Sequence, residues 1–145
     1  MLKHSLAITV IKHYEGFYAE PYICPAGIKT VGFGRTSGNL TDKTTEDAET
    51  IWLKNQVLKI DGTINSLVKP RLSQYQMAAL ISFIYNVGPS AFANSTLLEL
   101  INKQDLNASA QFLRWTKAAD VRLVGLAKRR TTEFLMYQSE LLKLL

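Results

Sequence analysis

The sequence predicts an α+β domain that is mainly α-helical, with a small β-sheet near the N-terminus and a larger helical part. A length of 145 residues fits one domain with its own core. Apolar residues recur at helical spacing in several segments, whereas residues 17–41 lose that spacing and contain turn-forming glycine and proline. We therefore expect a single domain over residues 1–145. Its β-lobe spans about 16–42, and its helical lobe spans about 63–145 together with the N-terminal helix.

The first expected helix runs from His4 to Tyr14 and buries one apolar stripe. Gly16 is a helix stop, which places Glu15 on the last turn or just beyond it. A carboxylate there meets the negative end of the helix dipole, and this opposes its ionisation. The position is unusual for a surface glutamate and suits a group that acts as an acid.

A small sheet of two or three strands is expected after this helix. Tyr22-Ile23 and Thr30–Phe33 have the composition of short strands. Pro25–Gly27 predicts the turn between them, and Ser37–Asn39 predicts a second turn. A sheet of this size is not stable alone, so it must pack against the helices.

Two longer helices follow. Thr44 is the expected cap of the first, Asp61-Gly62 is either a break or a bend in it, and Pro70 ends it. If it is continuous, it is long enough to connect two lobes. Ser73–Gln76 matches a capping box, and the mostly apolar segment behind it predicts a nearly fully buried central helix that stops at Gly88-Pro89. Shorter helices are expected at about 95–102, 107–115 and 126 to the end.

Composition narrows the classes of function. Cys24 is the only cysteine, so the chain has no intrachain disulfide and its fold needs no oxidising compartment. No apolar run approaches the ~20 residues of a transmembrane helix, and none has the features of a signal peptide. The net charge is +5, and residues 101–145 carry eight basic and four acidic residues. This excess favours polyanionic partners or a basic solvated surface, but no aromatic and basic face typical of nucleic-acid binding is present.

Glu15, Cys24 and Thr30 are the candidate catalytic residues. A hairpin would bring Cys24 and Thr30 to one side of the sheet, next to the helix end that carries Glu15. Cleavage of an acetal needs an acid that protonates the leaving oxygen and an opposite group that supplies or steadies the nucleophile. Many proteins contain these three residue types at similar spacing by chance, so spacing alone does not establish catalysis.

Motifs along nearly the whole chain, in the right order, strengthen this interpretation. They are Glu15-Gly16 after a helix, Pro25–Gly27 before Thr30, Val31–Gly34, Ser73–Tyr75 through Phe83–Gly88, Phe92 with Ser95–Leu98, and Gly125–Arg130 with Glu133. Together they resemble the phage-type lysozymes, the endolysins that cut peptidoglycan. The resemblance implies a lysozyme-like fold with a cleft between the two lobes.

The resemblance also implies a role for each candidate. Glu15 would be the general acid, position 24 (usually aspartate or cysteine in this family) would orient or activate water, and Thr30 would hold that water. We expect the Glu15 carboxylate to push the pKa of the Cys24 thiol above its ordinary ~8.5, so that Cys24 is mostly a thiol at neutral pH. A thiolate that forms a glycosyl-thioether is the alternative.

Further residues are expected at the substrate site. Asn86 would bind a sugar amide or hydroxyl, or else only end its helix, and Phe33 and Arg35 belong to the same site. Arg35 departs from the family pattern, in which histidine usually stands at this position. We expect it to pair with an acid such as Asp61, or with Glu15 itself. Trp52 is expected in the core, and so is Trp115, for which stacking on a sugar ring is the alternative. No metal site is predicted because no third ligand accompanies His4 and His13, and no cofactor is predicted.

The expected function is hydrolysis of the β-1,4 bond between N-acetylmuramic acid and N-acetylglucosamine in peptidoglycan, which would lyse the host cell. Two alternatives stay open: a lytic transglycosylase, and a catalytically silent basic module that binds the envelope. The partners expected are peptidoglycan and, through the basic C-terminal helix, an anionic outer-membrane surface, with no nucleic acid and a monomeric state. The protein would stay in the host cytoplasm until a separate pore releases it to the periplasm.

Overall fold

The computed structural model describes residues 1–118 and 120–142; Lys143–Leu145, the end of the last expected helix, lie outside the described residues. Helices dominate the described chain, and the strands form two separate two-stranded sheets. The elements in order are α1 (Leu2–Glu15), β1 (Tyr18–Ile23), β2 (Lys29–Gly32), α2 (Glu46–Leu67), α3 (Gln74–Val87), α4 (Pro89–Ala93), α5 (Thr96–Asn102), the 3-10 helix η1 (Ala108–Arg114), β3 (Lys117–Ala118), β4 (Val121–Arg122) and α6 (Val124–Leu142).

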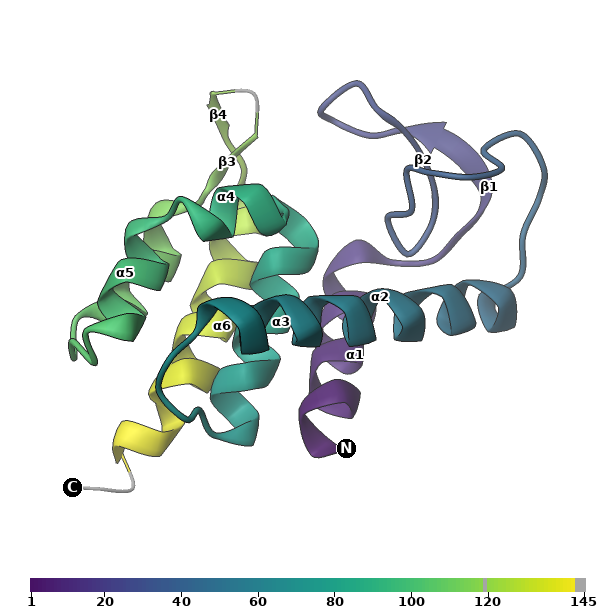
Figure 1. The fold of residues 1–145 in the computed structure, drawn as a ribbon. Helices are drawn as coiled ribbons and strands as arrows, with labels where there is room; N and C mark the ends of the chain where they lie inside the picture. Colours follow the sequence, from purple (N-terminus) through teal and green to yellow (C-terminus); the bar gives the residue numbers. More distant parts are fainter. Residues whose placement is uncertain (119, 143–145) are drawn as a thin grey trace.

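Helix α3 lies at the centre of the core, as its apolar sequence predicts. Every residue from Met77 to Ile84 is buried, and α3 packs against both α1 and α6. Its first turn has the predicted capping box, in which the Ser73 hydroxyl accepts from the Gln76 amide and the Gln76 side chain accepts from the Ser73 amide. Figure 1 shows both hairpins at the same end of the helices, with α2 running crosswise to α1 and α6.

The β1–β2 sheet is antiparallel and pairs Tyr22 with Thr30 and Ile23 with Lys29. Its register shifts between Tyr18 and Tyr22, where Pro21 has no amide hydrogen to donate to the ladder. The turn between the strands also matches the sequence prediction. Pro25 presets the backbone for the second turn position, and the Gly27 amide donates to the Cys24 carbonyl at 2.8 Å.

Helix α2 is continuous for 22 residues, so Asp61-Gly62 does not break it. The expected cap at Thr44 is wrong by one residue, because the Thr45 hydroxyl accepts from the Ala48 amide. The Thr44 hydroxyl instead donates to the Glu49 carboxylate at 2.9 Å. Its side chain is therefore committed to the network that joins the β-lobe to α2.

The C-terminal third departs further from expectation. The expected helix near residues 107–115 is a 3-10 helix, and the β3–β4 hairpin that follows it has no counterpart in the sequence prediction. Strands of two residues each leave almost no alternating pattern in the sequence. None of the helices in the described part of the chain is long and apolar enough to cross a membrane.

Candidate active site

Glu15 is the last residue of α1, as the glycine after it predicts. Gly16 has φ of 69°, a left-handed conformation that glycine adopts without strain, and its amide closes the helix on the Lys12 carbonyl at 3.0 Å. The chain therefore leaves the helix directly after the carboxylate and enters β1. This fixes Glu15 at the junction between the helices and the sheet.

Cys24 and Thr30 are placed by the β1–β2 hairpin. The Cys24 amide donates to the Ile28 carbonyl at 2.9 Å, which closes the hairpin directly beside the thiol. Thr30 lies in β2, is only 3% exposed, and its hydroxyl donates to the same Ile28 carbonyl at 2.9 Å. The two side chains are thus held by one short, hydrogen-bonded loop.

These three residues line one cleft of about 500 Å³. The β-lobe supplies one wall, and the opposite wall comes from the C-terminal end of α3, the chain after η1, strand β3 and the start of α6. Asn86 also lines the cleft, as expected. The lining residues are Glu15, Tyr22, Cys24, Ala26, Ile28, Thr30, Gly34, Thr36, Tyr85, Asn86, Val87, Trp115, Lys117, Ala118 and Leu126.

The two carboxylate oxygens of Glu15 have different neighbours. Oε1 accepts from Nη1 of Arg129 on α6 at 2.7 Å, and the Arg129 side chain is 3% exposed. Oε2 lies against Gly34, where an added Cβ would clash with it. Gly34 also has φ of 84°, so both its conformation and the close approach require glycine. The carboxylate is therefore held from both sides.

Arg129 is itself fixed by buried groups. Its Nη2 donates to the Ser82 carbonyl at 3.0 Å, and its Nε lies 3.5 Å from Glu133 Oε2. The Ser82 hydroxyl donates to that same Glu133 oxygen at 2.5 Å. Burial raises the pKa of Glu133, and the arginines beside it oppose that shift. Arg129 thus connects the cleft carboxylate to the core of α3 and α6.

The hairpin also changes the acidity of Cys24. Its partial burial raises the pKa of the thiol, but hydrogen bonds from the backbones of Ile28 and Ala26 and from the Thr30 hydroxyl lower it, and the net pKa is below the ordinary thiol value. The expectation that the Glu15 carboxylate would raise this pKa is therefore wrong. The pKa of Cys24 is lowered because these hydrogen-bond donors stabilise the thiolate.

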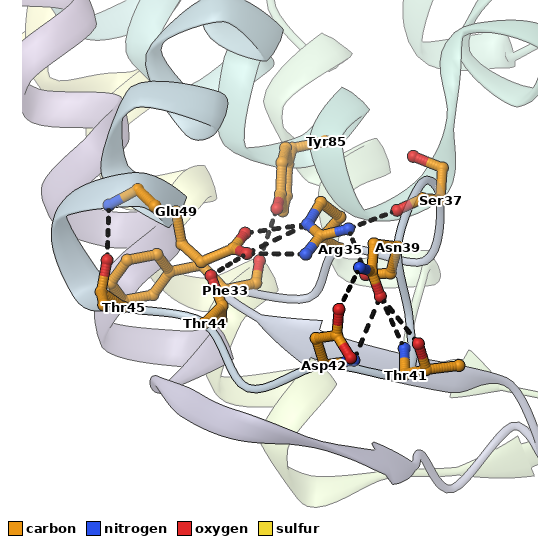
Figure 2. Close-up of polar contacts among 11 residues, drawn as sticks. Phe33, Arg35, Ser37, Asn39, Thr41, Asp42, Thr44, Thr45, Glu49 and Tyr85 are labelled. Carbon is orange, nitrogen blue, oxygen red and sulfur yellow. Dashed lines mark hydrogen bonds and ion pairs between the residues drawn. The ribbon is translucent and has the colours of Figure 1, made fainter.

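Arg35 and Phe33 do not line the cleft in the described structure. Arg35 pairs with an acid, as expected, but the acid is neither Asp61 nor Glu15: it is Glu49, with Arg35 Nη2 and Glu49 Oε1 2.8 Å apart (Figure 2). Asp61 is instead bound by Lys3 at 2.9 Å and by His4 at 2.5 Å.

Phe33 is buried for a related reason. The tight turn between Val31 and Arg35 turns its side chain into the core, where it is 2% exposed and packs against Phe17. Its carbonyl accepts from the Tyr85 hydroxyl, also drawn in Figure 2. Phe33 therefore contributes its backbone, and not its ring, to the region beside the cleft.

The Arg35–Glu49 pair organises the loop between β2 and α2. Arg35 Nη1 donates to the carbonyls of Ser37 and Asn39 at 2.5 and 2.9 Å, as Figure 2 shows. The hydrogen bond from Arg35 lowers the pKa of Glu49 despite its burial. This glutamate packs against Gly32, where an added Cβ would come within 2.5 Å of its carboxylate.

Sequence reasoning assigned no role to Arg129 or to the β3–β4 hairpin. The Gly125–Arg130 motif shared with the phage-type lysozymes is the sequence signal that could have identified Arg129. Its pairing with Glu15 leaves no local pattern, because the two residues are 114 positions apart. Trp115 is expected in the core, and it does pack edge-on against Phe83 with ring centroids 5.4 Å apart. It also lines the cleft.

Known proteins share both the sequence and the arrangement. The family model described as phage lysozyme matches residues 12–133. The chain is 36% identical over 138 residues to an endolysin of Acyrthosiphon pisum secondary endosymbiont phage 1, covering 91% of this chain and 94% of the relative.

Solved structures agree with this match. The muramidase domain of SpmX from Asticaccaulis excentricus superimposes with a TM-score of 0.83 at 29% identity, covering 92% of this chain and 95% of that domain. An endolysin from Escherichia coli O157:H7 phage FAHEc1 superimposes with a TM-score of 0.81 at 27% identity, covering 93% of this chain and 92% of that one.

Proposed function

Because the chain belongs to the phage lysozyme family, we propose that it hydrolyses the β-1,4 bond between N-acetylmuramic acid and N-acetylglucosamine, with Glu15, Cys24 and Thr30 as its catalytic residues. It is a phage endolysin that acts on peptidoglycan as a lysozyme-type glycoside hydrolase. The observation that supports these residues is their convergence, from a helix end and two strands, on one cleft of about 500 Å³.

Glu15 is the general acid of this proposal. Arginine only donates hydrogen bonds, so Oε1, which accepts from Arg129, is the oxygen that stays unprotonated. Oε2 then carries the proton and gives it to the glycosidic oxygen. The carboxylate that remains is stabilised by the Arg129 guanidinium, which is in place before the reaction begins.

Cys24 and Thr30 serve the attacking water. A thiolate at Cys24 accepts the proton of the water as the oxygen attacks the anomeric carbon, and becomes a thiol. The lowered pKa of Cys24 gives it a larger thiolate fraction than an ordinary thiol has at the same pH. The Thr30 hydroxyl, held beside the thiol by the hairpin, positions the water. The proton taken up by Cys24 and the proton lost by Glu15 balance through solvent after the products leave.

The products test the proposal. Hydrolysis leaves a reducing N-acetylmuramic acid, whereas a lytic transglycosylase, which uses one acid and no water-holding pair, leaves a 1,6-anhydro end. We expect digested peptidoglycan to show only reducing ends by mass spectrometry; anhydro ends would reject a hydrolase.

Early NMR spectra of the newly formed anomer decide between direct attack by water and a covalent intermediate on Cys24. Direct attack inverts the configuration of the anomeric carbon, and a covalent intermediate retains it.

The basic residues of α6 bear on the expected contact with an anionic outer-membrane surface. Of the three basic residues that open α6, Arg129 and Arg130 are 2% and 0% exposed and paired inside the protein, which leaves Lys128 exposed. We therefore favour a docked α6 over one that binds an anionic outer-membrane surface. A monomeric state and release from the host cytoplasm to the periplasm stay predictions from the sequence.

A further inference from the structure

Asn86 and Arg130 form a contact that the proposed mechanism does not use. Asn86 is exposed, lies on the last turn of α3 and lines the cleft. Its Oδ1 accepts from Nη2 of Arg130 on α6 at 2.9 Å. Arg130 is 0% exposed, so this hydrogen bond joins a cleft side chain to a fully buried charge.

The chemistry of arginine determines which end of the amide faces inward. A guanidinium has only donors, so the atom that meets Arg130 must be the amide oxygen and not the nitrogen. No partner for the Asn86 NH₂ group is present among the residues that the structure describes. The outer end of Asn86 is therefore a hydrogen-bond donor beside the sugar-binding space.

The guanidinium is held so that it cannot rotate away. Its Nε lies 2.9 Å from Glu133 Oε1, and its central carbon lies 5.0 Å from the centroid of the Phe83 ring. Glu133 is 0% exposed and is fixed in turn by Ser82. Since these groups sit in the packed core of α3 and α6, the orientation of Asn86 is set before any substrate binds.

We propose that Arg130 is a positioning residue that presents the Asn86 amide as a donor to a carbonyl oxygen of the bound glycan. This inference rests on the proposed function and deepens it by naming a specificity contact. Peptidoglycan offers two carbonyls of this kind, in the acetamido groups of the sugars and in the lactyl-peptide branch. A hydroxyl can accept or donate and would gain little from an amide of fixed polarity.

The test replaces the donor and keeps the shape. Asn86→Asp keeps an oxygen toward Arg130 but presents an acceptor to the cleft, and Asn86→Ala removes the amide. Asn107→Asp is the control, because it makes the same charge change at an exposed position outside the cleft lining. Turnover is measured on intact glycan strands, on partly de-N-acetylated strands, and on strands stripped of peptide by an amidase. Thermal melting confirms that each variant is folded.

We expect both Asn86 variants to raise KM on intact strands by about 3- to 10-fold with kcat nearly unchanged, as for loss of one hydrogen bond made equally in ground and transition states. De-N-acetylation removes the acetamido carbonyl, whereas the amidase converts the lactyl amide into a carboxylate. A smaller penalty on de-N-acetylated strands therefore identifies the acetamido carbonyl, and a changed penalty on peptide-free strands identifies the lactyl carbonyl. An unchanged KM, or an equal penalty on all three substrates, would overturn the inference.

A second comparison tests the role of Arg130. Arg130→Lys keeps the positive charge but loses the rigid, planar set of N–H donors that the guanidinium provides. We expect a KM like that of Asn86→Ala, with no further rise when the two changes are combined; additive effects would contradict a shared role. If Arg130→Lys does not fold, the Asn86 series decides alone. Failure of the proposed function itself would look different, because the parent protein would then release no reducing ends from intact strands.

Discussion

Cys24 is the proposed catalytic residue whose chemistry depends most on its surroundings. A thiol is a weak base until it ionises, and its thiolate fraction depends on which groups surround it. The turn that places Cys24 also points backbone donors at it, because the backbones of Ile28 and Ala26 hydrogen-bond its sulfur. The loop that fixes the position of the side chain thus also lowers its pKa.

The pH profile tests whether the thiolate is the working form. Below its pKa the thiol is protonated and cannot accept a proton, so kcat/KM should fall as the pH drops through the lowered pKa of Cys24. Cys24→Asp should stay active and move this fall toward the acidic range, because a carboxylate ionises near ~3.9. Cys24→Ser, which does not ionise, should lose the fall and most of the activity. If its profile superimposed on that of the parent, Cys24 would have no role as a base.

The loop from Arg35 to Glu49 is the element that joins the β-lobe to α2. Its central pair is well shielded, with side-chain exposures of 12% and 3%. Just before this loop, two glycines lie against carboxylates: Gly32 against Glu49, and Gly34 against Glu15. The chain that leads into the ion pair therefore also passes close to the proposed catalytic carboxylate of Glu15.

Removing Arg35 should destabilise the fold. Arg35→Met leaves a buried carboxylate without its partner, and we expect a loss of about 3–5 kcal/mol in the free energy of unfolding at pH 7. Because pairing lowers the pKa of Glu49, this contribution is present above the ordinary glutamate pKa of ~4.3 and disappears as the pH falls through the lowered value. Urea unfolding at several pH values should show the difference between parent and variant shrinking in acid.

An exposed ion pair provides the control for that measurement. Lys103 and Glu99 are paired at 2.9 Å on the surface of α5, with side-chain exposures of 65% and 59%. Lys103→Met should leave the unfolding free energy unchanged within error, because solvent screens such pairs. If Arg35→Met were equally harmless, or if its effect did not depend on pH, Arg35 would not be the structural partner of Glu49.

The molecule as a whole builds its cleft from opposite ends of the chain. Glu15 lies near the N-terminus, and Arg129, which holds its carboxylate, lies 114 residues later. The Tyr14 hydroxyl donates to the Lys128 carbonyl at 3.2 Å and contacts the Thr132 hydroxyl, so these contacts join α1 to α6 beside Glu15. Acid and arginine can therefore meet only after these two helices have packed.

Features that depend on local sequence could be predicted, whereas contacts between distant segments could not. Glycine after Tyr14-Glu15, the capping box at Ser73 and the turn before Gly27 are local signals, so Glu15, α3 and the hairpin with Cys24 and Thr30 were all placed correctly. The partners of Arg35 and Glu15 were not found, because pairing between distant segments leaves no periodic pattern. Arg35 has several carboxylates within the range of a loop, and only the packed fold selects Glu49.

The general-acid role of Glu15 is tested most directly by Glu15→Gln in a turbidity assay on permeabilised cells. Glutamine keeps the shape and an oxygen that can accept from Arg129, so the variant should melt like the parent, but it cannot donate an acidic proton to the glycosidic oxygen. We expect the lysis rate to fall by at least about 10²-fold. Lysis by a folded Glu15→Gln variant as fast as by the parent would contradict the proposal that Glu15 is the acid, and would favour a protein that acts by binding alone.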